Sequence, residues 1–161
     1  MDLKNVELAL QSLVDYPHMV GIMGGEPTLH PQFIEICLLI SQYVPRGRRG
    51  LWTNGALWNK YEKIIEKTFD YQNIVYNDHS YEGGHHQPLM VSSQDIVMDK
   101  DLMWNLINKC WIQNRWSASI TPKGCFFCEV AAAMDTLYRG PGGYPIEPGW
   151  WRKTPDEFRD Q

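Results

Sequence analysis

The sequence predicts an α/β fold with a parallel sheet, followed by a small Cys-rich C-terminal subdomain. In residues 1–77, amphipathic helical stretches alternate with short apolar runs, an order typical of parallel strands joined by crossover helices. After residue 100 the composition changes, because most of the 7 Trp residues and three of the 4 Cys residues lie there. We therefore divide the chain into an α/β core of residues 1–100 and an extension of residues 101–161, rich in Cys, Trp, Gly and Pro.

The first elements follow from hydrophobic periodicity and from helix-breaking residues. Apolar residues at helical spacing predict a helix over residues 2–15, and Pro17 ends it. The nearly continuous apolar run of residues 18–23 predicts a strand that is covered on both faces, and two glycines end it. Pro31 suits the first turn of the next helix. The buried face of that helix is predicted to hold Phe33, Ile36, Cys37 and Ile40.

The remaining elements are predicted in the same way. GLWTNG at 50–55 and NIVYN at 73–77 predict two more strands, and the amphipathic stretch 58–69 between them predicts a helix. The later elements are a strand near 89–92, a helix over 99–109, a strand over 117–120, a tight turn at 122–124 and a short helix that begins at the Cys pair. The final Gly- and Pro-rich segment is predicted to be irregular.

Composition and charge exclude several classes of partner. The net charge of −4 gives no reason to expect nucleic acid, and the basic cluster at 46–49 is interpreted as a solvated loop. The longest apolar run, near residues 33–40, is too short to cross a membrane. The N-terminus predicts a helix and no signal peptide, so we expect a cytoplasmic protein without a membrane partner.

The segment GGEP at 24–27 follows the first predicted strand. In parallel α/β folds, ligands bind at the carboxyl ends of the strands. Glycine lets the backbone approach a ligand closely, and exposed carbonyls beside a carboxylate suit a cationic group such as an ammonium. The alternative is a simple strand-to-helix turn in which Glu26 is solvated.

GGEPTLHP at 24–31 after an apolar strand, together with LWTNG at 51–55, resembles the radical S-adenosylmethionine (radical SAM) enzymes. The resemblance covers roughly residues 1–100 and implies a partial parallel (βα) barrel that binds S-adenosylmethionine. In the family, the first motif contacts the amino group of the methionine moiety. The cofactor-binding residues implied are Gly24, Gly25, Glu26 and Pro27, with Thr53 and Asn54 nearby on the neighbouring strand.

The chain departs from this family in one respect. The Cys-x3-Cys-x2-Cys motif that binds the catalytic 4Fe-4S cluster is not present. We interpret the chain as a fragment lacking that N-terminal segment or as a degenerate member, and we expect it to be catalytically inactive alone. The intact protein would be an oxidoreductase that depends on an external electron donor. Its catalytic residues and its substrate are not identified by the sequence.

The downstream cysteines form the second candidate site. Cys125 and Cys128 are two residues apart after a Pro-Lys-Gly turn, and Cys110 lies upstream across a predicted strand. Thiolates at this spacing can share one metal, although three ligands do not close a zinc or 4Fe-4S site. The arrangement resembles the SPASM or twitch extensions that bind auxiliary 4Fe-4S clusters. Zinc and unliganded thiols remain alternatives, so a non-catalytic zinc- or iron-binding α/β module is the second function considered.

Overall fold

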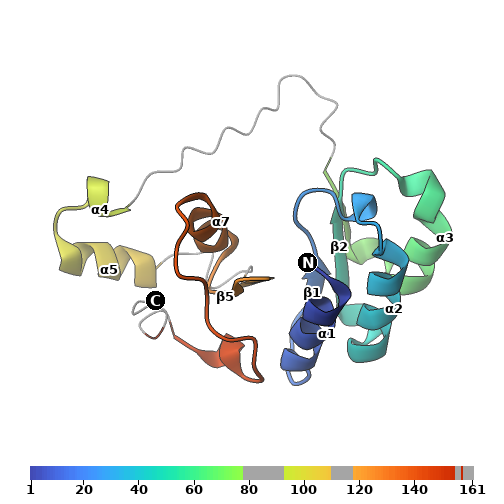
Figure 1. Cartoon of the computed structure of the whole chain (residues 1–161), viewed down its shortest axis with the longest axis horizontal. Coiled ribbons are helices and arrows are strands. Elements are labelled where there is room, and N and C mark those ends of the chain that lie inside the picture. Colours follow the sequence, from blue (N-terminus) through green and yellow to red (C-terminus); the bar gives the residue numbers. More distant parts are fainter. Residues whose placement is uncertain (78–92, 110–117, 155–156, 158–161) are drawn as a thin grey trace. The chain divides into compact units, whose positions relative to one another are not determined.

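The computed structural model is an α/β protein, described here for residues 1–77, 93–109, 118–154 and 157. The chain divides into two compact units, Met1–His85 and His86–Gln161. We call them the N-terminal unit and the C-terminal unit and describe each by itself (Figure 1). The sequence placed the division between residues 100 and 101.

The N-terminal unit alternates helices and strands as the sequence predicts. Its helices and strands are α1 (Leu3–Ser12), β1 (Val20–Ile22), α2 (Phe33–Tyr43), β2 (Arg49–Thr53), α3 (Trp58–Thr68) and β3 (Ile74–Tyr76). Short 3₁₀ turns precede α2, β2 and β3, at η1 (Pro27–Leu29), η2 (Arg46–Arg48) and η3 (Tyr71–Asn73). The predicted helix over residues 2–15 ends three residues early, where the Ser12 hydroxyl donates to the Ala9 carbonyl at 2.7 Å.

The three strands are parallel and lie in the order β1-β2-β3. Ile22, Leu51 and Ile74 are register partners, so they form one row across the sheet. This row faces a core to which α1, α2 and α3 all contribute, and Figure 1 shows α2 and α3 on one side of β1 and β2. The α/β class and the parallel strands are therefore confirmed. Within the described residues the sheet is open and does not close into a barrel.

The predicted buried face of α2 is confirmed. Phe33, Ile36, Cys37 and Ile40 are all buried in this core or against it. Burial raises the pKa of the Cys37 thiol to about 12, although a hydrogen bond involving Thr68 opposes the shift. Cys37 is therefore a neutral core residue, as its place in the helical pattern predicts.

The opposite face of the sheet is partly exposed, since Gly21 in β1 is exposed and Trp52 in β2 is half-buried, so the prediction of a first strand covered on both faces is wrong. A Cβ atom on Gly21 would lie 2.2 Å from Cζ3 of Trp52, and one on Gly50 would lie 2.7 Å from the same atom. The Trp52 ring therefore lies across the backbones of β1 and β2, which only glycine at both positions permits.

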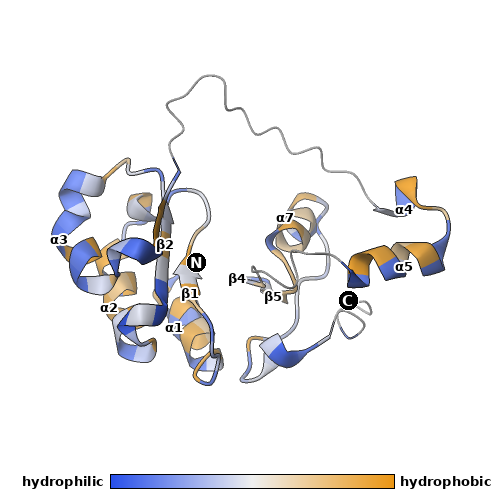
Figure 2. Cartoon of the chain, turned by 180° about the vertical axis from the view of Figure 1, so that it is seen from behind, coloured by the Kyte–Doolittle hydropathy of each residue, from blue (hydrophilic) through white to orange (hydrophobic). Residues whose placement is uncertain are grey.

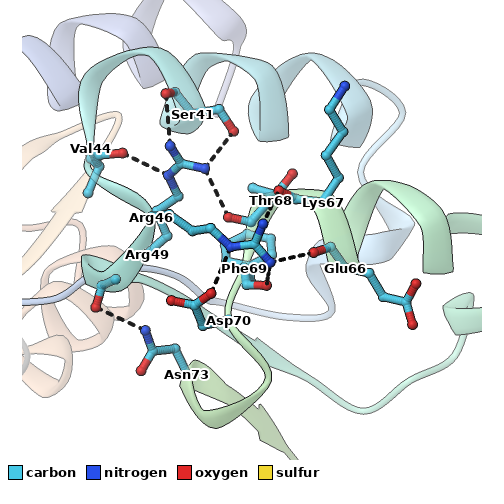
Figure 3. A network of polar contacts seen from close by, with 11 residues as sticks. Ser41, Val44, Arg46, Arg49, Glu66, Lys67, Thr68, Phe69, Asp70 and Asn73 are labelled. Atoms are coloured by element: carbon cyan, nitrogen blue, oxygen red, sulfur yellow. Dashed lines mark hydrogen bonds and ion pairs between the residues drawn. The ribbon is translucent and has the colours of Figure 1, made fainter.

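The arginines near η2 correct the interpretation of residues 46–49 as a solvated loop. Arg46 donates to the carbonyls of Glu66 and Phe69 and pairs with Asp70 at 2.7 Å (Figure 3). Arg49 donates to the Ser41, Val44 and Thr68 carbonyls at 2.7–3.0 Å. These carbonyls belong to the C-terminal ends of α2 and α3, which have no partners within their own helices. The two guanidinium groups therefore join both helix ends to the start of β2.

The C-terminal unit contains short elements only. They are α4 (Ser93–Ile96), α5 (Lys100–Asn108), β4 (Ser119–Thr121), β5 (Gly124–Phe126), α7 (Glu129–Leu137) and the 3₁₀ turn η4 (Trp150–Arg152). In Figure 2, hydrophobic and hydrophilic residues alternate along α5, as expected for an amphipathic helix. The strand predicted near 89–92 lies outside the described residues. No helix in the described ranges has both the length and the apolar character needed to cross a bilayer.

An antiparallel hairpin and the segment after α7 hold the C-terminal unit together. β4 pairs with β5 across the predicted turn, and Tyr144 adds an antiparallel bridge to Cys125, with both backbone hydrogen bonds at 2.8 Å. Lys123 in the turn pairs with Asp135 and donates to the Gly140 carbonyl at 2.7 Å. Trp150 is buried, at 2% exposure. The irregular segment is thus fixed to the hairpin by backbone and charge contacts.

Candidate functional site

The GGEP segment lies at the carboxyl end of β1, as predicted. Gly24 and Gly25 have φ values of +101° and +54°, which glycine adopts at little cost. Both glycines are exposed, Glu26 is half-buried, and Pro27 is buried. The backbone of the two glycines is therefore the accessible part of this turn.

The Glu26 carboxylate binds groups of its own chain. Oε1 accepts the Thr28 and Thr53 hydroxyls, each at 2.6 Å, and the Thr28 amide at 3.0 Å. Oε2 accepts the Asn54 amide at 2.6 Å. The alternative in which Glu26 is simply solvated is therefore wrong, because its carboxylate accepts four hydrogen bonds, two from Thr28 in the same turn and two from Thr53 and Asn54 at the end of β2.

Two opposing effects act on the pKa of Glu26. Burial alone raises the pKa, because a carboxylate loses hydration. The hydrogen bonds from Thr28, Thr53 and Asn54 stabilise the charged form and together outweigh burial, so the pKa lies below the ordinary value of 4.5. Glu26 is therefore ionised at neutral pH, with its charge held by the protein's own donors.

The segment TNG at 53–55 also makes hydrogen bonds within its own turn. The Thr53 hydroxyl accepts the Gly55 amide at 3.0 Å, and Asn54 Oδ1 accepts the Ala56 amide at 2.8 Å. Gly55 has φ +77° and its carbonyl accepts the Trp58 amide at 3.0 Å, which starts α3. All three residues therefore shape the turn from β2 into α3.

Sequence reasoning missed Thr28, which contributes two of the four hydrogen bonds. A signal was available, since a Thr two residues after an acidic residue at a turn is typical of local side chain-to-backbone capping. The structure confirms this geometry, because Glu26 is the N-cap of η1 and its side chain accepts the Thr28 amide.

The described residues include two of the three cysteines of the second candidate site. Cys110 lies outside the described residues, and Cys125 and Cys128 are both buried near the hairpin. The Cys125 Sγ is 3.8 Å from the Pro145 carbonyl, while the Cys128 Sγ accepts the Ala131 amide at the start of α7. Burial, with a smaller effect of Glu147, raises the pKa of the Cys125 thiol to about 12. Among the described residues, no three His, Cys, Asp or Glu side chains gather as a metal site would need.

Comparisons with protein-family models, with curated proteins and with solved structures return no match for this chain.

The lowered pKa of Glu26 predicts an acid-dependent stability. Its contribution is expected to be fully present above the ordinary pKa of 4.5 and to be lost as the pH falls through the lower folded-state value. Urea unfolding of the wild type and of Glu26→Gln from pH 7 to pH 3 measures this difference. The two midpoints should converge at low pH, whereas a gap that stays constant would mean that the Glu26 charge does not stabilise the fold.

Proposed function

We propose that the N-terminal unit binds S-adenosylmethionine at the Gly24–Glu26 turn and that the chain is a radical SAM-type protein. The observation that carries this proposal is the exposed Gly24-Gly25 backbone at the carboxyl end of a parallel strand, next to a charged and fully ionised Glu26. Ligands of parallel α/β folds bind at this edge. The motif resemblance adds the identity of the ligand, since the turn carries GGEP and the neighbouring strand carries TNG.

The residues at the turn fit one part of this ligand, its ammonium group. A primary ammonium donates three hydrogen bonds, and the exposed backbone carbonyls of the two glycines are suitable acceptors. Glu26 adds a negative charge close to the same turn, which favours a cation. Pro27 is buried and stiffens the exit of the turn.

S-adenosylmethionine supplies radical-based chemistry in this family when a reduced 4Fe-4S cluster is bound beside it. The described residues do not provide the ligands for such a cluster. We therefore propose binding of the cofactor by this chain, and no turnover by the chain alone.

Calorimetry with S-adenosylmethionine and the full chain tests the proposal. We expect saturable binding by the wild type and a loss of roughly tenfold or more in affinity for Gly24→Val, because a β-branched residue at φ +101° is strained. Gly47→Ala is the control, since its Cβ would meet only Asp70 Oδ2 at 4.0 Å. Absence of binding by the wild type, or equal binding by Gly24→Val, would refute the proposal.

The second candidate function is that of a metal-binding module at the Cys pair. The placement of Cys125 in β5 and of Cys128 at the N-cap of α7 favours it, because thiols two residues apart at one hairpin–helix junction can share one iron–sulfur cluster or zinc ion once they are deprotonated. Metal analysis and a visible spectrum after anaerobic purification separate the two metals. Protein-bound iron with broad absorbance indicates a cluster, stoichiometric zinc indicates a zinc site, and protein free of both metals rejects this candidate.

A further inference from the structure

We infer that Thr28 and Thr53 are positioning residues that hold the candidate site through Glu26 and do not contact the ligand. This inference rests on the proposed function, and it changes the role that the motif resemblance implies for Thr53. The hydroxyls of the two threonines and the Glu26 carboxylate, which we call the Glu26 clamp, are internal parts of the protein.

Burial separates the two threonines from any ligand. Thr28 is 0% exposed and Thr53 is 1% exposed, whereas Gly24 and Gly25 are exposed. A ligand at the turn can reach the glycine backbone but cannot reach either hydroxyl without unfolding the turn. Any effect of these hydroxyls on binding must therefore pass through the residue that they contact, which is Glu26.

The geometry of the Glu26 clamp indicates a strong and specific contact. Both hydroxyls donate to the same oxygen, Oε1, at 2.6 Å, a distance typical of hydrogen bonds to an ionised acceptor. With the Thr28 amide, Oε1 has three donors, and an oxygen of a carboxylate has about two lone-pair sites. Oε1 is therefore saturated by the protein.

The clamp connects segments that are far apart in the sequence. Thr28 lies in the 3₁₀ turn that leads to α2, and Thr53 ends β2, 27 residues after Glu26. The Thr53 hydroxyl also accepts the Gly55 amide, so one oxygen links Glu26 to the turn before α3. Gly24 and Gly25 directly precede the clamped residue. Their unusual backbone angles are thus fixed at one end by β1 and at the other end by the clamp.

Thr53→Val and Thr53→Ser provide a matched pair of variants. Valine keeps the shape and removes the hydroxyl, whereas serine keeps the hydroxyl and removes a methyl group. The reporter is the amide proton of Asn54, which we expect to resonate far downfield because its nitrogen is 2.6 Å from Glu26 Oε2. In Thr53→Val this signal should move upfield and amide exchange at Gly25, Glu26 and Thr28 should rise roughly tenfold, while Thr53→Ser should resemble the wild type.

The affinity for S-adenosylmethionine, measured on the same full-length variants, tests positioning. We expect a loss of roughly tenfold for Thr53→Val and a change of about twofold or less for Thr53→Ser. In the double variant Glu26→Gln/Thr53→Val the losses should not add, because both changes remove the same contact.

The outcomes separate the clamp from the proposed function. An Asn54 amide signal that Thr53→Val leaves unchanged would overturn the clamp. A changed signal with unchanged affinity would overturn its role in positioning. A clamp signature in a wild-type chain that binds no S-adenosylmethionine would overturn the proposed function and leave the clamp supported as a structural contact.

Discussion

Replacing Arg49 by methionine is expected to lower the free energy of unfolding of the N-terminal unit by about 3 kcal/mol. Methionine keeps the apolar stem but removes every donor of the guanidinium group. The carbonyls of Ser41, Val44 and Thr68 then lose their partner at the ends of two helices. Unsatisfied carbonyls near the core cost more than the side chain's own packing contributes, which is why we expect a large effect.

Urea unfolding monitored by circular dichroism, with hydrogen exchange resolved along α2 and α3, measures this loss. Arg49→Lys is the informative comparison, because lysine keeps the charge but lacks the planar fork that reaches carbonyls of two helices. It should recover less than half of the stability. Lys63→Met, which removes an exposed cation from α3, should change the stability by less than about 0.5 kcal/mol. If Arg49→Met behaved like Lys63→Met, the helix-joining role of Arg49 would be wrong.

The role of these arginines shows where sequence reasoning failed and why. A cation shortly after a helix end can cap the last carbonyls of that helix, so the Arg49 contact with Ser41 and Val44 had a local signal. The contacts with α3 had none. Arg46 reaches Glu66, and Arg49 reaches Thr68, 20 and 19 residues further along the chain. Such partners are set by the packing of α2 beside α3, which no local pattern encodes.

The elements themselves were largely predictable, because each has a strong local cause. Phe33, Cys37 and Ile40 recur at helical spacing and are buried in α2. The short apolar runs before Gly24 and Gly55 are strands, and both glycines have positive φ where the strands end. Local sequence patterns do not indicate whether a sheet closes into a barrel, because closure depends on pairing between strands that are far apart in the chain. The partial barrel that the motif resemblance implies stays a prediction, because the three described parallel strands form an open sheet.

The position of the candidate site could be predicted from the sequence, but the role of each of its residues could be predicted only in part. The motifs at 24–27 and 53–55 meet, since Glu26 bonds to both Thr53 and Asn54. The interpretation made from the sequence was that the Glu26 carboxylate can bind a cationic ligand directly. Whether a carboxylate faces solvent or the chain's own donors depends on the register of β1 beside β2, and register is a property of the folded sheet.

In the C-terminal unit, Gly143→Ala is expected to lower the free energy of unfolding by about 3 kcal/mol. A Cβ atom at Gly143 would lie 2.3 Å from the Cys125 carbonyl oxygen and 2.8 Å from the Cys125 nitrogen. Both are backbone atoms, so no side-chain rotation relieves the contact. The segment must move away, which breaks the two hydrogen bonds between Cys125 and Tyr144. Because Cys125 is 0% exposed, this movement also opens the buried centre of the hairpin.

Hydrogen exchange of the Cys125 and Tyr144 amides reports this change directly, and accessibility of the Cys125 thiol to a maleimide reports the loss of burial. Both should rise in Gly143→Ala, since the two amides donate to each other's residue in the wild type. Ala133→Ser, which adds one atom to an exposed position of α7, is the control in the same unit and should cost about 0.5 kcal/mol or less. Wild-type protection of the Cys125 thiol in Gly143→Ala would show that the bridge to Tyr144 does not hold the hairpin closed. In that case the hairpin and α7 alone would bury the Cys pair, and the irregular segment would have no part in shaping the candidate metal site.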